Sequence, residues 1–448
     1  MFTIDCKIRQ ASHRIFINII KSLILKNKKN IDGYRLVLTK IRSGEMFLVR
    51  DKMDMNRAKN VLHTSLTVYK DFEEAGKKYR GSADVSLSPT MDEEEINKKI
   101  EEAAFAAQFV KNEWYPLSRP SSEKPFSLSS SFDTENLNEE LVKIQKAIYK
   151  KRDTKAEINS TEIFIDNMEV QILNSEGVDV RFKKYKGYIE VITDCSIGKE
   201  EVEIYGDNSF STESEKLIDN MVSEQLKETE ERALAEKAKH LKSVNVIITN
   251  TAAASFFDFY ISQASASMVY TKSSAAKLGE NFQGSGVKGD KVNIKLVPDM
   301  AGSPYSAPYD GDGLLLKEHE LYKDGIVKTY HGSIKFAHYL NVEPTGNIIN
   351  FEVGAGAKTE ADLKKEPYVE ILTFSDFFQD EVTGDFGGEF RLARYFDGKA
   401  LHIINNGSIS GNMFDAQKEF YFSKERVQHS NYLGPKSIMI PNMEVLGD

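Results

Sequence analysis

Cysteine is scarce in this sequence, and its apolar N-terminal stretch is too short to span a membrane. The two cysteines, Cys6 and Cys195, are far apart and form no ligand pair, which excludes a disulfide scaffold and suits a reducing compartment. The apolar residues 15–25 fall short of the roughly 20 that cross a bilayer, and Lys21 interrupts them. No small-residue cleavage site follows. We therefore expect a buried amphipathic helix here and a cytoplasmic protein with no membrane partner.

Catalytic motifs are missing as well. There is no GxSxG and no Cys/His constellation. No histidine belongs to HExxH or HExxxH, the spacing that brings two imidazoles to one zinc ion at about 2.1 Å. His319 is followed by Glu320, but Lys323 and Asp324 stand where a second histidine would fall. We interpret the eight histidines as single surface or core residues: His13, His63, His240, His319, His331, His338, His402 and His429.

The net charge of -9 is distributed unevenly. Residues 1–60 contain 14 Lys or Arg and 5 Asp or Glu, so the remainder is strongly acidic. A basic segment can bind nucleic acid or a membrane surface. Because these lysines flank a predicted helix and two strands, a solvated domain surface is favoured, and the overall acidity makes a nucleic-acid partner the weaker hypothesis.

The length of 448 residues predicts two or three domains. We expect an N-terminal α+β module at 1–116, a linker at 117–134 that is rich in proline and serine, a middle α+β module at 135–240 and a β-rich module at 241–448. In the first module, alternation predicts a hairpin around residues 42–44, and Thr90 with Glu93 forms a capping box for a helix. In the second, a long helix opens near Thr212 and is expected to run to about residue 240.

The C-terminal module begins with an apolar strand at 244–249, which we expect to be buried on both faces, followed by a helix at 251–267. Residues 377–412 form the densest β pattern. Phe386, Phe390 and Leu392 are evenly spaced and should share one face of a strand. Thr383-Gly384-Asp385, Asp397-Gly398 and Asn406-Gly407 are predicted to be turns, the last two as tight reversals.

These C-terminal motifs resemble those of a known family. TGDF, INNG, SGNMFDAQKEF and GPKSIMIPNMEVLG occur in the order seen in the last third of the TldD/PmbA family, known as modulators of DNA gyrase or U62-type peptidases. Residues 310–313 are similar to the family's DDEG turn, with Gly311 departing from it, and Pro344-Thr-Gly-Asn347 also matches. The resemblance implies an α+β fold of N-terminal sheet-plus-helix modules followed by a β-rich domain. It also marks structural turns at Asp310, Gly313, Gly346, Thr383, Gly384, Asp385, Asn406 and Gly407.

The catalytic branch of this family, TldD, carries HExxxH on the helix after the buried strand, and a cysteine nearer the C-terminus. Here the corresponding positions are Asp258, Phe259 and Gln263, and residues 430–435 contain no cysteine. The resemblance therefore implies the PmbA/TldE-like branch. It predicts no catalytic or metal-binding residue and no cofactor in this chain, with zinc held by a TldD-type partner.

The function expected on this basis is that of a non-catalytic subunit in a TldD/TldE-type metalloprotease that acts on unfolded or small peptides. The chain would form a homodimer, or a heterodimer with a TldD-like subunit, and extended peptides could add to exposed strand edges. Two alternatives stay open: a metal-dependent peptidase with a non-standard ligand set, and a gyrase-modulating or nucleic-acid-associated binding protein.

Overall fold

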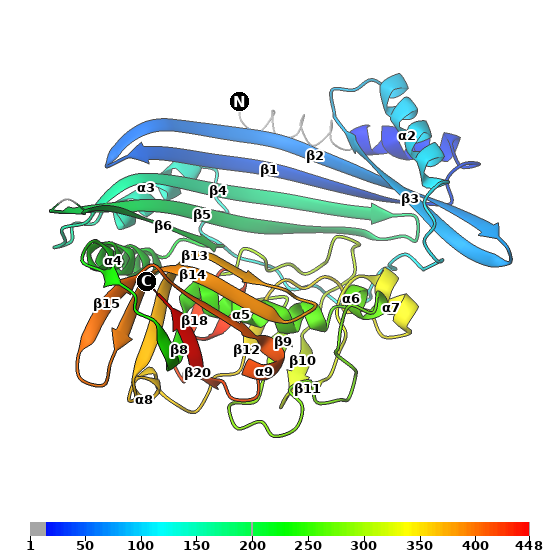
Figure 1. Cartoon of the computed structure of the whole chain (residues 1–448). Coiled ribbons are helices and arrows are strands. Elements are labelled where there is room, and N and C mark those ends of the chain that lie inside the picture. The colour runs from blue at the N-terminus through cyan, green and yellow to red at the C-terminus, as the bar shows by residue number, and fades with distance from the viewer. Residues whose placement is uncertain (1–14, 199, 448) are drawn as a thin grey trace.

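The computed structural model describes residues 15–198 and 200–447, so Cys6 and His13 lie outside the described residues. Long strands run side by side in one part of the molecule, and the C-terminal elements pack beneath them (Figure 1). The fold is α+β, as predicted. Among the described residues, no helix is long and apolar enough to cross a membrane.

A six-stranded antiparallel sheet in the order β3-β2-β1-β4-β5-β6 forms the upper part. Strand β1 pairs with β4, so the first two predicted modules contribute to one sheet, while the domain boundaries themselves stay a prediction. The strands of this sheet are β1 (Gly33–Val49), β2 (Lys52–Glu74), β3 (Lys77–Leu87), β4 (Glu157–Asn174), β5 (Asp179–Ile197) and β6 (Glu200–Phe210).

The hairpin predicted around residues 42–44 is wrong, because β1 continues through it and turns only at Arg50, whose φ is 56°. Ser43 pairs with neighbours on both sides, which keeps the strand extended. Gly44 serves close packing instead of a turn: a Cβ there would lie 3.1 Å from Leu141 and 3.2 Å from Leu137 of the covering helix α3. The glycine thus lets a helix approach the sheet.

Helices cover one face of this sheet: residues 15–26, α2 (Glu93–Ala107), α3 (Leu137–Ile148) and α4 (Glu215–Ala233). The capping box of α2 is formed by Asp92 and Glu95, two residues beyond our prediction, because the Thr90 hydroxyl is engaged with Ser88. Helix α4 ends at Ala233, short of the predicted end, because residues 236–237 pair with β15.

The C-terminal part is β-rich and holds the largest hydrophobic core, formed by α5, β8 and the strands around them. Its helices are α5 (Asn250–Gln263), α6 (Ala266–Tyr270), α7 (Ile334–Leu340), α8 (Glu360–Leu363) and α9 (Met413–Ala416). Its strands are β7 (Glu236–Lys237), β8 (Leu241–Thr249), β9 (Ile294–Leu296), β10 (His319–Lys323), β11 (Ile326–Val327), β12 (Phe351–Val353), β13 (Tyr368–Gln379), β14 (Asp385–Phe396), β15 (Leu401–Asn405), β16 (Gly407–Asn412), β17 (Tyr421–Phe422), β18 (Arg426–His429), β19 (Tyr432–Pro435) and β20 (Ser437–Leu446).

Within β14, the predicted face is confirmed: Phe386, Phe390 and Leu392 are all buried. The reversal predicted at Asn406-Gly407 is wrong. Strands β15 and β16 pair with β14 in one continuous register, and Asn406, with a φ of 54°, only kinks the chain between them. Gly407 is needed for packing, since a Cβ there would lie 2.3 Å from the Phe390 ring.

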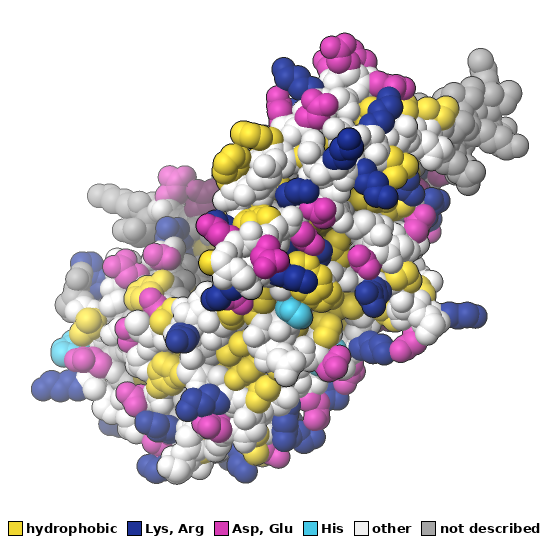
Figure 2. Space-filling model, turned by 90° about the vertical axis from the view of Figure 1, so that its right-hand side faces the viewer, with side chains coloured by type: hydrophobic (Ala, Val, Ile, Leu, Met, Phe, Trp, Pro, Cys, Tyr) yellow, Lys and Arg dark blue, Asp and Glu magenta, His cyan; other side chains and the backbone are white. Residues whose placement is uncertain are grey.

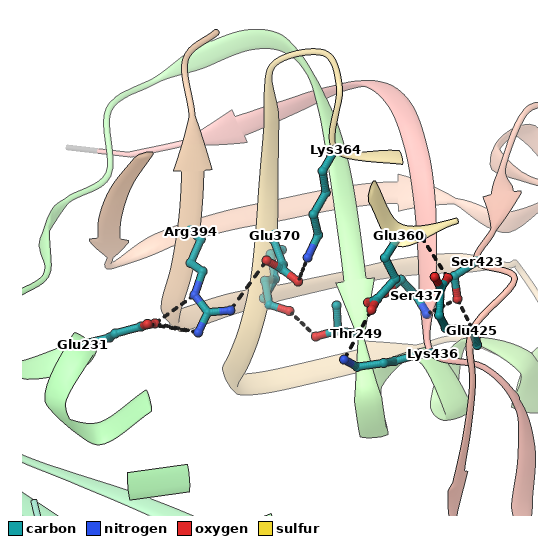
Figure 3. A network of polar contacts seen from close by, with 11 residues as sticks. Glu231, Thr249, Glu360, Lys364, Glu370, Arg394, Ser423, Glu425, Lys436 and Ser437 are labelled. Atoms are coloured by element: carbon teal, nitrogen blue, oxygen red, sulfur yellow. Dashed lines mark hydrogen bonds and ion pairs between the residues drawn. The ribbon is translucent and has the colours of Figure 1, made fainter. Parts of the chain in front are cut away.

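A polar network joins the two parts of the molecule (Figure 3). The Arg394 guanidinium of β14 donates to both carboxylate oxygens of Glu231 on α4, at 2.9 and 3.0 Å. Its other side faces Glu370 of β13 at 3.8 Å, and Lys364 donates to Glu370 at 2.6 Å. These side chains are mostly buried, so the bidentate pair fixes α4 against the C-terminal sheet.

Candidate functional site

Helix α5, which follows the buried strand β8 directly, carries the three positions that the family resemblance assigns to metal chemistry. Residues 246–248 of β8 are fully buried, as predicted. Thr249 ends the strand with its hydroxyl donating to the Ile371 carbonyl at 3.1 Å, and the chain turns there into α5. Strand and helix thus hold Asp258, Phe259 and Gln263 in fixed positions.

Gln263 is fully buried and its side-chain amide is used on both sides. The amide nitrogen donates to the Glu381 carbonyl at 2.6 Å. The amide oxygen accepts from the Ala275 N–H at 2.7 Å and from the Ser274 hydroxyl at 3.2 Å. These bonds tie α5 to two loops, so the Gln263 amide is committed to structure.

Phe259 is also fully buried. Its ring packs edge-on against Phe414 and Tyr260, with centroids 5.3 and 5.7 Å apart, and lies 5.8 Å from Phe282. An aromatic residue in this cluster cannot polarise water, which is the task of a glutamate at this position in a zinc peptidase.

Asp258 differs from its two neighbours because its side chain reaches solvent. Protein nevertheless surrounds the carboxyl closely enough that desolvation, and secondarily the charge of Glu381, raise its pKa to about 7. Solvent that reaches the exposed carboxylate weakens this effect. Glu381 therefore contributes twice here, through its carbonyl to Gln263 and through its charge to Asp258, and no sequence motif signals it.

The segment 430–435, where the family resemblance would place a cysteine, lies next to α5. The buried Tyr432 ring stacks on Phe257 of α5 at a centroid distance of 6.0 Å, and its hydroxyl donates to the Pro435 carbonyl at 2.8 Å. A Cβ at Gly434 would lie 2.4 Å from that hydroxyl. The fold thus brings both predicted metal-site segments together, but tyrosine and phenylalanine rings fill the space between them.

The histidines are dispersed. His331 is half-buried and its Nε2 lies 2.8 Å from the Ile261 carbonyl, and desolvation lowers its pKa. Burial also lowers the pKa of His429. In the part of the chain that the structure describes, no three His, Cys, Asp or Glu side chains are close enough together to hold a metal ion. The residues at the family's zinc position therefore do not fit the ion.

The family-motif turns at 310–313 and 344–347 meet in space, which the sequence did not show. The buried Asp310 carboxylate accepts from the N–H groups of Asp312 at 2.9 Å, Leu314 at 3.0 Å and Asn347 at 3.3 Å. Desolvation raises its pKa to about 6. Gly346, at a φ of 75°, lies so close that a Cβ would be 3.0 Å from the Asp310 carboxylate. This aspartate acts as a structural clamp between two loops.

The remaining motif turns, around Gly384 and Gly313, depend on backbone conformations that favour glycine. Gly384 has a φ of 76°, and the Asn412 amide nitrogen donates to the Thr383 carbonyl and the Asp385 carboxylate, at 3.0 and 2.8 Å. Gly313 also adopts a positive φ of 75°. These positions require glycine for backbone reasons, and none of the described motif turns presents reactive chemistry.

The sequence of this chain is similar to those of several known proteins. Residues 241–447 match the family described as the PmbA/TldA metallopeptidase C-terminal domain. An uncharacterized protein of Methanocaldococcus jannaschii is 24% identical over 176 residues, covering 36% of this chain and 40% of that protein. Metalloprotease PmbA of Escherichia coli O157:H7 is 20% identical over 207 residues, covering 45% of each. Each match thus spans less than half the length of the relative.

Two solved structures share the fold over almost the whole chain. TldE from Thermococcus kodakarensis superposes with a TM-score of 0.76 at 18% identity, over 96% of this chain and 100% of that one. A protein of Thermotoga maritima named as a candidate modulator of a DNA gyrase gives 0.75 at 18% identity, with the same coverage. Fold and site together define a protein with the architecture of TldE and its relatives. The C-terminal part of the chain, residues 241–447, belongs to the PmbA/TldD family of domains, in which proteins are named as metallopeptidases and modulators of DNA gyrase.

Proposed function

We propose that this chain is a non-catalytic, TldE-like subunit that pairs with a zinc-bearing, TldD-like peptidase acting on unfolded or small peptides. The main observation behind this proposal is that the α5 side chains at the metal-ligand positions already make structural contacts. Gln263 gives both ends of its amide to main-chain groups, and Phe259 is part of an aromatic core. A position already engaged in this way cannot be released to a metal ion without breaking the local structure.

The proposal gains support from what the fold retains. The C-terminal sheet and the ordered loops at Asp310 and Gly384 supply a framework that could carry an interface with a partner subunit. Symmetric association through one shared patch is the commonest form of assembly in soluble oligomers. We expect the C-terminal part to supply an interface that buries more than about 1,000 Å² in total.

Strand β2 offers a place for an extended peptide. Residues 52–63 pair with β1 on one side, whereas β3 begins its pairing only at Thr64. Within the described chain, the outer edge of this stretch has no partner strand, and its side chains are exposed, including Met53 and Met55. An unpaired edge recognises main-chain groups and tolerates varied side chains, which suits a subunit that handles unfolded peptides.

Co-expression with an HExxxH-bearing homologue, followed by co-purification and elemental analysis, tests the proposal. We expect a heterodimer with about one zinc per pair, and a homodimer of this chain without stoichiometric zinc. A matched control is the homologue with its HExxxH glutamate changed to glutamine, which should pair normally and cleave nothing. Finding about one zinc per chain in this protein alone after dialysis would contradict the proposal. A protein that stays monomeric and does not bind the homologue would contradict it as well.

No specific observation favours the alternative that this chain is a gyrase-modulating or nucleic-acid-associated protein. On the face shown in Figure 2, lysine and arginine side chains are interspersed with aspartate and glutamate, without a continuous basic stripe. Nucleic-acid binding by phosphate contacts requires clustered positive charge. This face therefore gives the nucleic-acid hypothesis no support.

A further inference from the structure

The free edge of β2 carries a regular order of side chains in addition to its unpaired main-chain groups. Residues 52–63 pair with β1 on one side, and no described strand pairs with them on the other. An extended stretch of this length spans about 40 Å. Lys59 and Val61 line a hollow of about 440 Å³ together with Glu45 of β1, so these side chains lie on one face of the sheet. Arg57 pairs with Glu45 in register and therefore lies on the same face.

Two cations on this edge share one carboxylate. Arg57 and Lys59 both form ion pairs with Glu45, whose side chain is only 4% exposed, whereas the cationic side chains are 47% and 48% exposed. The Arg57 guanidinium also lies 5.0 Å from the centre of the Phe47 ring, which restricts its position. Glu162 senses the Arg57 charge but makes no ion pair within the described chain. Glu45 balances only one of the two cations that it binds, so the other is available to a partner.

Apolar side chains flank the two cations on the same face. Met55 precedes Arg57 by two residues and Val61 follows Lys59 by two, and both apolar side chains are 40% exposed. The order along the edge, at every second residue, is therefore apolar, basic, basic, apolar. Side chains that lie opposite each other on paired strands are about 4.5–5.5 Å apart at Cβ, so each position favours a complementary neighbour. This order is the same in both directions, so the direction of an added strand does not change the match.

A second copy of this edge is a poor occupant. Self-pairing centred on Arg57 places that residue opposite its own copy, and self-pairing centred on Ala58 places it opposite Lys59. Like charges directly opposite each other are destabilising, and basic side chains on an edge strand oppose edge-to-edge association. The complementary occupant is a strand that supplies carboxylates.

We propose that the β2 edge binds an extended peptide in which two acidic residues, two positions apart, are flanked at the same spacing by apolar residues. The peptide main chain pairs with residues 52–63. Its carboxylates face Arg57 and Lys59, and its apolar side chains face Met55 and Val61. Main-chain bonds supply the affinity, and the alternate side chains supply the specificity. This inference rests on the proposed function, in which the edge receives unfolded peptides, and it names the class of peptide.

Fluorescence anisotropy with labelled nine-residue peptides tests the side-chain pattern on the full chain alone. The probe alternates threonine with valine, glutamate, glutamate and valine, and in two matched probes both glutamates are replaced by glutamine or by lysine. We expect saturable binding of the glutamate probe. The glutamine probe should bind about three- to tenfold more weakly and the lysine probe more weakly still, because ion pairs at half-exposed sites contribute modestly. Raising the salt concentration to about 0.5 M should remove most of this difference.

Main-chain pairing is tested with two N-methylated forms of the glutamate probe. One form is methylated on its glutamates and valines, and the other on the threonines between them. In a strand, alternate residues direct their main-chain groups to the same edge, so only one of the two forms loses its hydrogen bonds to β2. We expect that form to bind at least about tenfold more weakly than the other.

The variant Lys59→Gln identifies the available cation. It leaves Arg57 paired with Glu45, so its melting temperature should match that of the wild type, and it should reduce the preference for glutamate over glutamine to less than about twofold. The exposed control variant Lys242→Gln should keep the full preference. The inference is overturned if the glutamate probe does not bind, if the three side-chain probes bind equally, if the two methylated forms lose affinity equally, or if Lys59→Gln keeps the preference. No peptidase is present in these assays, so peptide binding can fail while pairing with the homologue succeeds, and the reverse outcome is equally visible.

Discussion

The truncation Gln263→Ala gives the sharpest view of what α5 does in this chain. It would leave two buried main-chain groups without partners: the Glu381 carbonyl, which accepts from Gln263 at 2.6 Å, and the Ala275 N–H, which donates at 2.7 Å. Ser274 keeps its bond to the Gln263 carbonyl at 2.5 Å. Each stranded group costs about 1–3 kcal/mol, and the cavity adds to this, so we expect a loss of about 3–5 kcal/mol.

In a domain of this size, each kcal/mol lowers the melting temperature by about 2–4 °C, so the C-terminal transition should fall by roughly 10 °C. Differential scanning calorimetry measures this, because it separates the C-terminal transition from others in a chain that need not unfold in one step. Ser262→Ala is the matched control. Ser262 neighbours Gln263 on α5, is partly exposed and makes no side-chain hydrogen bond to a described residue, so its truncation should cost less than about 0.5 kcal/mol.

Equal melting temperatures for Gln263→Ala and Ser262→Ala would refute this reasoning. The Gln263 amide would then not be essential to the packing of α5, and its position would be free for other chemistry. The claim that structure has replaced a metal ligand would lose its basis.

The remaining predictions concern the turn at Gly384, the exposed Asp258 carboxyl and the Arg394–Glu231 junction between the two parts of the molecule. Gly384→Val should aggregate or lose most of its thermal stability, because it forces a side chain into a φ of 76° with its Cβ 2.9 Å from the Phe414 ring; a soluble protein with an unchanged melting temperature would contradict this. Asp258→Asn should match the wild-type melting temperature at pH 4 and exceed it at pH 8. The pKa of Asp258 in the folded protein, about 7, lies above its value in the unfolded chain, so raising the pH from about 4 to about 7 destabilises the wild type. The same difference in melting temperature at both pH values would contradict the pKa shift. Arg394→Ala should destabilise the junction by about 3 kcal/mol and increase proteolysis after α4, since it leaves the mostly buried Glu231 carboxylate without its bidentate partner, whereas the exposed Arg391→Ala should do neither.

Local patterns in the sequence were sufficient for many individual elements. Leu137, Leu141, Ile144 and Ile148 repeat at helical spacing and form the buried face of α3, because one helix face must meet the core whatever the tertiary arrangement. The alternation through residues 386–392 fixed the buried face of β14 in the same way. For the candidate site, the residue pattern predicted the helix that follows the buried strand, and the family resemblance assigned Asp258, Phe259 and Gln263 to the metal-ligand positions on it.

What each position does was decided by contacts between residues far apart in the chain. Gly44 and Asn406-Gly407 have the composition of turns, yet neither reverses the chain. Gly44 stays extended because it pairs with β2 and β4, and Gly407 continues the pairing with β14 after the kink at Asn406. Likewise, Gln263 could be a ligand or a structural residue until residues 274–275 and 381 supply its partners. The sequence by itself determined periodicity, and with it the faces of helices and strands. Only the tertiary structure decided which polar groups are satisfied, because their partners come from segments that no local pattern connects.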